Sequence, residues 1–382
     1  MQLITKTDDL AAASKALAAA PYAAVDTEFL RETTYWPKLC LVQAAAPGVE
    51  ALIDPLAPGL DLSPFLDFMA NPKTVKVFHA ARQDLEIFLK LMGQLPAPIF
   101  DAQIAAMAMG LGDSIAYDGL VQAMLGQRID KSSRFTDWSR RPLSDAQLSY
   151  ALADVTHLRD IYPLMLERLS KGGREAWIVD EHAALVDPEI YDMTPENAWK
   201  RLKLRKGNQD YLAVLQTAAA WRERQAQSKD VPRGRILKDD ALHEIAEQRP
   251  RNSQAFDRLR AVPKGFGNSR NGQELIGEIE RVLSGANRAP VRVERAPPLP
   301  PGIGPTVELL KVLLRYEAEK HEVAPRLIAS VADLELIAAS DEADVAALKG
   351  WRREVFGEQA LKLKHGKLAL TLKRGQVAVE ET

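Results

Sequence analysis

Two acidic side chains interrupt the most strand-like stretch near the start of the chain. In Tyr22–Phe29 (YAAVDTEF), Asp26 and Glu28 stand two residues apart among mostly apolar neighbours. Successive side chains of a strand point to opposite faces, so these two carboxylates share one face. Placing both there costs free energy unless water or a cation stabilises their charge. The fold must therefore either expose this face on a solvated edge or bring a cation to it.

Two further segments supply acids. Asp84 lies near the start of a predicted helix (81–91) that follows the alternating strand 74–78, and Asp154 follows Tyr150 by four residues on another predicted helix. Each has an ordinary structural explanation, since an acid near a helix N-terminus is favourable and a tyrosine can simply pack on a core helix.

Taken together, four carboxylates from three segments suit a pair of divalent cations. Mg²⁺ and Mn²⁺ are hard cations that prefer oxygen ligands. Two such ions roughly 3.5–4 Å apart can hold the attacking and leaving oxygens of a phosphodiester. The acids therefore indicate a nuclease.

The order of elements predicts an α/β region followed by helices. Strand patterns occupy 22–29, 39–45, 51–53 and 74–78, and Ser144–Gln147 forms a capping-box motif before the helix that carries Tyr150 and Asp154. Four helices are predicted at 208–224, 240–246, 253–260 and 272–283. A proline-rich linker at 289–305 and a smaller helical unit at 306–375 follow.

Charge is unevenly distributed. Residues 199–295 hold 21 Lys and Arg against 12 Asp and Glu, an excess of nine positive charges. Because the net charge of the whole chain is −2, the remaining residues together carry a net charge of −11. A basic helical module suits contact with a polyanion, although a solvated helical surface explains the excess equally well.

The expected compartment is the cytoplasm. The single cysteine, Cys40, excludes an internal disulfide and a cysteine-based zinc site and favours a reducing compartment. The first residues do not form a signal peptide, and no apolar run reaches the 18 residues needed to span a membrane. We expect no membrane association and no obligate protein partner.

The motif order resembles the DEDDy 3′→5′ exonucleases. That order is Asp-x-Glu, then Asp, then Tyr-x-x-x-Asp. Three further segments are similar to the ribonuclease D family, namely Leu39–Gln43 (LCLVQ), His79–Glu86 (HAARQDLE) and Thr136–Leu143 (TDW…RPL). The basic helices resemble an HRDC domain and the last unit a degenerate second copy. The resemblance thus covers nearly the whole chain.

The resemblance implies a fold and a domain order. We expect an α/β ribonuclease H-like (DnaQ-like) exonuclease domain with a mixed sheet and flanking helices at 1–195. Two all-α HRDC-type domains follow, at 199–288 and, beyond the linker, at 306–375.

It also implies the chemistry. Asp26, Glu28, Asp84 and Asp154 would ligate two Mg²⁺ or Mn²⁺ ions, with Asp26 bridging them, and Tyr150 would position the attacking water. The expected activity is removal of nucleotides as 5′-monophosphates from RNA 3′ ends, with tRNA precursors as substrates. One departure from the family pattern is His79, which stands where related enzymes often have Asn. Asp101 is expected to be an N-cap, and assistance to the site is the lesser alternative for this residue.

Side chains near Trp138 are candidates for guiding the RNA strand. Arg134, Arg140 and Arg141 could contact phosphates and Trp138 could stack on a base, but a packed surface turn is an equal alternative.

Two other functions remain as alternatives. A DNA-directed exonuclease would use the same site, and a non-catalytic nucleic-acid-binding scaffold is disfavoured because clustered acids repel a polyanion. A helicase is disfavoured because the chain has no Gly-x-x-x-x-Gly-Lys-Ser/Thr loop.

Overall fold

The computed structural model describes residues 3–130, 132–205, 208–285 and 299–382. Within them the chain forms two compact units. Unit 1 takes in the described residues of 1–28, 40–187 and 296–382, and unit 2 those of 29–39 and 188–295. The chain thus leaves unit 1 after residue 28, contributes segment 29–39 to unit 2 and returns to unit 1 at residue 40. The predicted consecutive domains did not include this excursion. Most of the predicted linker 289–305 lies outside the described residues.

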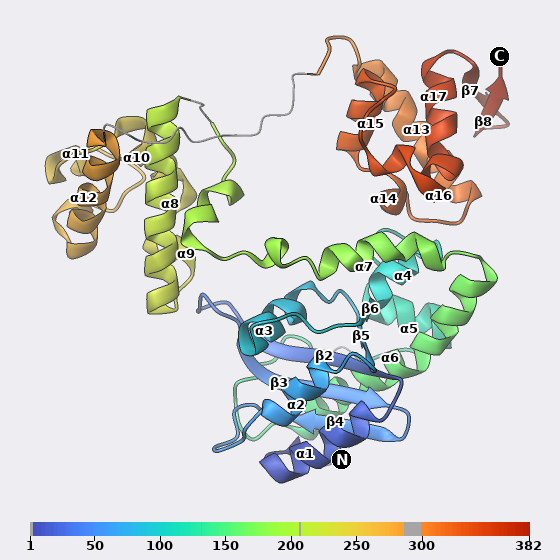
Figure 1. Ribbon diagram of the computed structural model, residues 1–382, viewed down its shortest axis with the longest axis horizontal. Helices are drawn as coiled ribbons and strands as arrows, with labels where there is room; N and C mark the ends of the chain where they lie inside the picture. The colour runs from blue at the N-terminus through green and yellow to red at the C-terminus, as the bar shows by residue number, and fades with distance from the viewer. Residues whose placement is uncertain (1–2, 131, 206–207, 286–298) are drawn as a thin grey trace. The chain divides into compact units, whose positions relative to one another are not determined.

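A six-stranded mixed sheet forms the centre of unit 1 (Figure 1). The strands are Leu3–Ile4 (β1), Tyr22–Leu30 (β2), Lys38–Ala46 (β3), Val49–Ile53 (β4), Val75–Phe78 (β5) and Ile99–Asp101 (β6), in the order β1-β4-β3-β2-β5-β6. β3 and β4 pair antiparallel, whereas β1 with β4, β2 with β5 and β5 with β6 pair in parallel. The predicted mixed sheet is therefore confirmed, and β2, with its two acids, lies in the interior of the sheet.

Helices flank the sheet, and the longest carries two candidate site residues. They are Thr7–Ala18 (α1), Ser63–Ala70 (α2), Arg82–Met92 (α3), Ala102–Ala108 (α4), Tyr117–Leu125 (α5), Asp145–Lys171 (α6), Glu175–Ile178 (η1) and Val179–Leu185 (α7). α1 packs on α2 and β4, and α6 packs on β4 and β5. The predicted capping box is present, because the Ser144 hydroxyl accepts from the Gln147 N–H while the Gln147 side chain accepts from Ser144. Ala151, Val155 and Leu158 bury one face of α6.

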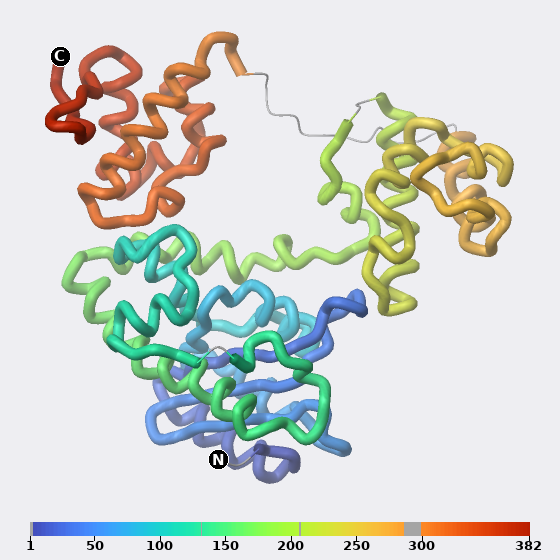
Figure 2. Tube along the Cα trace, turned by 180° about the vertical axis from the view of Figure 1, so that it is seen from behind, coloured from blue at the N-terminus to red at the C-terminus, as the bar shows by residue number. Residues whose placement is uncertain are grey.

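The last part of the chain belongs to the core of unit 1. Its helices are Gly304–Lys320 (α13), Pro325–Ile328 (α14), Val331–Ala339 (α15), Ala346–Leu348 (η5), Gly350–Arg352 (α16), Arg353–Gly357 (η6, a π-helical turn) and Glu358–Lys364 (α17). The hairpin Leu368–Lys373 (β7) and Gln376–Glu381 (β8) follows, and both views show it beside these helices (Figures 1 and 2). Helices were predicted here and are confirmed, but β7 begins inside the range predicted as all-helical. The rings of Trp177 and Trp351 stack at 4.2 Å, which joins this region to the sheet region.

Unit 2 is helical, as predicted. Its elements are Pro188–Tyr191 (η2), Pro195–Arg201 (η3), Gln209–Lys229 (α8), Arg233–Ile236 (α9), Asp239–Gln248 (α10), Ser253–Asp257 (α11), Phe266–Asn268 (η4) and Arg270–Ser284 (α12). Tyr211 and Trp221 of α8 form the centre of its core with Phe256 and Leu275. In neither unit is any described helix long and apolar enough to cross a membrane.

Candidate active site

Three of the predicted acids come together. Asp26 and Glu28 from β2 and Asp154 from α6 each place a carboxylate oxygen within 4.8 Å of the others. We call these three residues the acid cluster. The strand alternation puts the first two on one face, and the packing of α6 against the sheet brings up the third.

Asp84 lies beside the acid cluster rather than within it. It is buried in the first turn of α3, and the Thr27 hydroxyl donates a hydrogen bond to its carboxylate. Burial, followed by repulsion from Asp26, raises the pKa of Asp84 well above its usual range. Asp84 is coupled to the acid cluster even though Thr27 holds its carboxylate, because repulsion from Asp84 also contributes to the raised pKa of Glu28.

Burial also keeps protons on the acid cluster. It raises the pKa of Asp26 to about 6, that of Asp154 to about 8 and that of Glu28 to about 9. For Glu28, repulsion from the other acids adds to this effect. A divalent cation would displace these protons, since it offsets both burial and repulsion.

Two tyrosines approach Asp154. The Tyr150 phenol, one helical turn before it, hydrogen-bonds its carboxylate and partly offsets the rise in the pKa of Asp154 that burial causes. Tyr117 of α5 donates from its hydroxyl to the backbone carbonyl of Asp154. The predicted pairing of Tyr150 with Asp154 is therefore present, and Tyr117 fixes the same helical turn.

Gln43 on β3 supports Asp26. Its Nε2 donates to the Asp26 carboxylate at 2.8 Å, and its side chain is fully buried. Its Oε1 has no hydrogen-bond partner among the described residues. A polar residue inside the apolar run LCLVQAAA is the signal that could have marked it from the sequence.

Asp101 positions the segment that leads to Asp84. Its carboxylate accepts from Gln103 N at 2.7 Å, the predicted N-cap, and also from Ala80 N at 3.1 Å and Ala81 N at 2.8 Å. Ala80 has a φ of 59°, which a non-glycine residue rarely adopts, so these bonds hold a strained turn. His79, just before it, is partly buried and bonds the Ile115 carbonyl through Nε2 at 3.1 Å.

The residues predicted to guide RNA have different environments. Trp138 is buried, with its ring 6.2 Å from that of Tyr150, so packing explains its placement. Arg141 makes two bonds to Asp54 at 2.6 and 2.7 Å and one to the Cys40 carbonyl, a structural tie. Arg140 is exposed.

Arg134 and Phe135 are exposed, whereas Arg141 is held by its bonds to Asp54. Arg134 is exposed, and its charge partly offsets the rise in the pKa of Glu28 and Asp154 that burial causes. Its guanidinium lies 5.1 Å from the ring centre of Phe135, whose side chain is 90% exposed. No periodicity in the sequence marked Phe135, because its exposure depends on the irregular loop that carries it.

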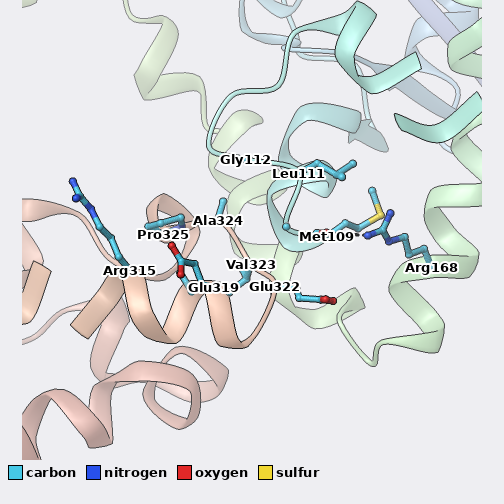
Figure 3. A pocket seen from close by; sticks show the side chains of 12 residues that line it. Met109, Leu111, Gly112, Arg168, Arg315, Glu319, Glu322, Val323, Ala324 and Pro325 are labelled. Atoms are coloured by element: carbon cyan, nitrogen blue, oxygen red, sulfur yellow. Dashed lines mark hydrogen bonds between the residues drawn. The ribbon is translucent and has the colours of Figure 1, made fainter. Parts of the chain in front are cut away.

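The chemistry of these donors fits divalent cations. All the ligands offered by the acid cluster are carboxylate oxygens, which hard cations prefer. A hollow of about 450 Å³ elsewhere in unit 1, shown in Figure 3, is lined by residues that include Arg168 of α6 and Arg315 and Glu319 of α13. None of the four acids lines it, so it is separate from the candidate site.

Comparisons with known proteins find an exonuclease domain and an HRDC domain in this chain. Residues 1–170 match the family model for 3′-5′ exonucleases, and residues 211–279 match that of the HRDC domain. The chain is 52% identical to ribonuclease D of Nitrobacter hamburgensis over 99% of this chain and 98% of that one. It is 48% identical to ribonuclease D of Gluconacetobacter diazotrophicus over 96% of this chain and 94% of that one.

A solved structure with a similar fold also matches over nearly the whole chain. The crystal structure of Escherichia coli RNase D, described as an exoribonuclease involved in structured RNA processing, superposes with a TM-score of 0.81 at 30% identity. The match covers 95% of this chain and 98% of that one. The expected exonuclease fold and the first of the two expected HRDC domains are thereby confirmed.

Proposed function

This chain belongs to the ribonuclease D family of 3′→5′ exoribonucleases, and from that premise we propose that it trims RNA 3′ ends one nucleotide at a time. tRNA precursors are the proposed substrates and nucleoside 5′-monophosphates the products. The approach of the Asp26, Glu28 and Asp154 oxygens to within 4.8 Å carries the proposal, because cations stabilise carboxylates that are clustered and at least partly buried. We place the activity in the cytoplasm, where such precursors are processed.

Asp26, Glu28, Asp154 and Asp84 would hold the ions, with Asp26 between them. Two Mg²⁺ or Mn²⁺ ions, when bound, would supply activation of the water and neutralisation of the negative charge on the phosphate oxygens. To join the other three acids, Asp84 would exchange its bond from Thr27 for a cation. Gln43 would keep Asp26 oriented, since it already donates to that carboxylate.

Tyr150 would orient the attacking water. Its phenol already reaches the Asp154 carboxylate, and burial raises its pKa, so it stays protonated and can donate a hydrogen bond at neutral pH. Arg134 and Phe135 would guide the strand, the first by phosphate contact and the second by stacking on a base. Arg140 is a further phosphate contact, whereas Arg141 and Trp138 would support the loop from within.

One experiment tests the activity and its competitors. The purified protein is given 5′-labelled single-stranded RNA, single-stranded DNA of the same sequence and a tRNA precursor, with Mg²⁺, Mn²⁺ or EDTA. Stepwise shortening of RNA that stops in EDTA supports the proposal. Equal shortening of DNA would favour the DNA-directed alternative, and binding without cleavage in either metal would favour the scaffold.

A further inference from the structure

The connection between β2 and β3 is the starting observation. Glu28 is the last residue of unit 1 before segment 29–39, and that segment belongs to unit 2 with residues 188–295. The chain returns to unit 1 at Cys40, three residues before Gln43. The strands that carry Asp26, Glu28 and Gln43 are thus joined by a loop that folds with the helical unit.

Tyr35 anchors this loop in unit 2. Its side chain is buried, and its hydroxyl donates to the Glu223 carboxylate of α8. Gln227 Nε2 at 3.1 Å and Arg233 Nη2 at 2.9 Å both donate to the same hydroxyl. The guanidinium of Arg233 also lies 4.6 Å from the Tyr35 ring centre.

Glu223 is the buried charge on which this anchor depends. Its side chain is fully buried, and it accepts from Arg201 at 2.6 Å and twice from Arg233 at 2.6 Å. Burial opposes its ionisation, but these partners outweigh burial and lower its pKa. We call Tyr35, Arg201, Glu223, Gln227 and Arg233 the Glu223 cluster.

The backbone of the loop is held as well. The Asp230 carboxylate accepts from Tyr35 N at 3.1 Å and Trp36 N at 3.0 Å. Asp230 ends α8 with a φ of 48°, in the left-handed region. Side chain and backbone are therefore both fixed by the end of one helix.

We propose that the Glu223 cluster is a positioning element for the catalytic site. By holding segment 29–39, the cluster sets the direction in which β2 ends and hence the placement of Glu28. Unit 2 then has two separable roles, because a grip on RNA acts on binding whereas the loop anchor acts on catalysis. The inference rests on the proposed role of Glu28 as a metal ligand. A purely structural anchor would stabilise unit 2 and leave the site unchanged.

The test uses the full chain and a short single-stranded RNA, with rates measured across a Mg²⁺ titration. Tyr35→Phe removes the hydroxyl and keeps the ring, and Glu223→Gln is a second variant of the same cluster. The control is Asp239→Asn, which breaks the ion pair of a buried α8 arginine outside the cluster, Arg222, at 2.7 Å without touching the loop. We expect Tyr35→Phe to lower kcat about tenfold, since a 1 Å misplacement can cost roughly 10²-fold.

The Mg²⁺ concentration for half-maximal rate should rise with that loss, while Asp239→Asn changes neither quantity. A matched fall in melting temperature for Tyr35→Phe and Asp239→Asn, with normal kcat and Mg²⁺ midpoint in both, would overturn the positioning role. Glu28→Gln in the same assay separates the two proposals. If Glu28→Gln loses activity and Tyr35→Phe does not, only the positioning role fails, whereas full activity in Glu28→Gln overturns the metal site itself.

Discussion

Asp154 gives the most direct single-residue test of the site. Asp154→Asn keeps the size of the side chain but removes a proposed ligand charge, so turnover should be abolished while the protein stays folded. Asp160→Asn is the matched control, because Asp160 lies on the same helix, half exposed and bonded to Arg159. Rates on labelled RNA and circular dichroism check both variants. Near wild-type cleavage by Asp154→Asn would refute the two-metal assignment.

Tyr150 tests how water is positioned. Tyr150→Phe keeps the ring against Trp138 but loses the hydroxyl that reaches Asp154. We expect kcat to fall roughly 10²-fold with RNA affinity unchanged, the range typical of a positioned acid–base group. Tyr162→Phe is the control, since Tyr162 is a buried tyrosine of the same helix that packs on Tyr22 and Phe100. An unchanged kcat in Tyr150→Phe would leave Tyr150 with a packing role only.

The raised pKa values of the acid cluster predict how stability depends on pH. Asp26, Asp154 and Glu28 have pKa values of about 6, 8 and 9 in the folded chain. Unfolded carboxyls titrate near about 4, so the folded state binds more protons between these values. The free energy of unfolding of the metal-free protein should therefore fall as pH rises from about 4 towards about 9. The other charged and titratable groups that act on this cluster are Asp84, Tyr117, Tyr150 and Arg134.

Melting temperatures in EDTA across this range check the prediction. Glu28→Gln should flatten the decline because it removes the acid with the highest of these values, and saturating Mg²⁺ should flatten it in the unmodified chain. Glu308→Gln, on the surface of α13, should not change the slope. A melting temperature that rises with pH in EDTA would contradict the assignment.

At the scale of elements, the loop that carries Arg134 and Phe135 is the proposed strand guide. Phe135→Ala should raise KM for single-stranded RNA about tenfold, because base–aromatic stacking is worth roughly 1–3 kcal/mol. Leu372→Ala removes another exposed apolar side chain, 74% exposed on β7, and should change nothing. Equal KM values for the two variants would return Phe135 to an ordinary surface residue.

Elements also separate what the sequence could predict from what it could not. Asp26 and Glu28 could be predicted because a period of two, local to β2, puts them on one face. Tyr150 and Asp154 share a face of α6 for the analogous helical reason, and the capping box predicted the start of that helix. The bond from Thr27 to Asp84 could not be predicted, because it joins residues 57 positions apart through tertiary packing.

The same limit applies to long-range supports. Asp101 was predicted as a cap from its own helix, but its bonds to Ala80 and Ala81 cross from β6 to the turn after β5. The Tyr35–Glu223 bond spans 188 residues, and no local pattern encodes it. The sequence left Trp138 either to stack on a base or to pack within the domain, and its burial in the structure favours packing.

At the scale of the whole molecule, each unit is built from separated segments of the chain, so a truncated fragment disturbs both units. A fragment ending near Asn197 would remove α8, which supplies most partners of Tyr35, and would also remove the helices α13–α17 that share the core of unit 1. Loss of activity in such a fragment would therefore report damage to unit 1 as well as loss of RNA binding. Point changes in the full chain avoid this ambiguity.

Arg258, Arg260 and Lys264 are suited to that purpose. All three are exposed on unit 2, and among the described residues no ion pair neutralises their side chains. If the basic unit holds RNA phosphates, changing all three to Gln should weaken binding of a tRNA precursor and lower the slope of log affinity against log salt by about 2, since each contact contributes roughly 0.7–0.9. The kcat on a short RNA should stay unchanged, because these residues lie outside the Glu223 cluster.

Changing Lys171, Lys311 and Lys349 to Gln removes the same charge from unit 1, where each lysine pairs with a nearby acid. That control should leave the salt slope of the full chain as it is. A slope unchanged in the unit 2 variant would mean that its positive charge is a solvated surface. A slope reduced equally in both variants would mean that total charge, rather than the basic unit, attracts RNA. Only a selective reduction, with kcat preserved on short RNA, assigns phosphate binding to unit 2 and separates it from the catalytic role of its loop anchor.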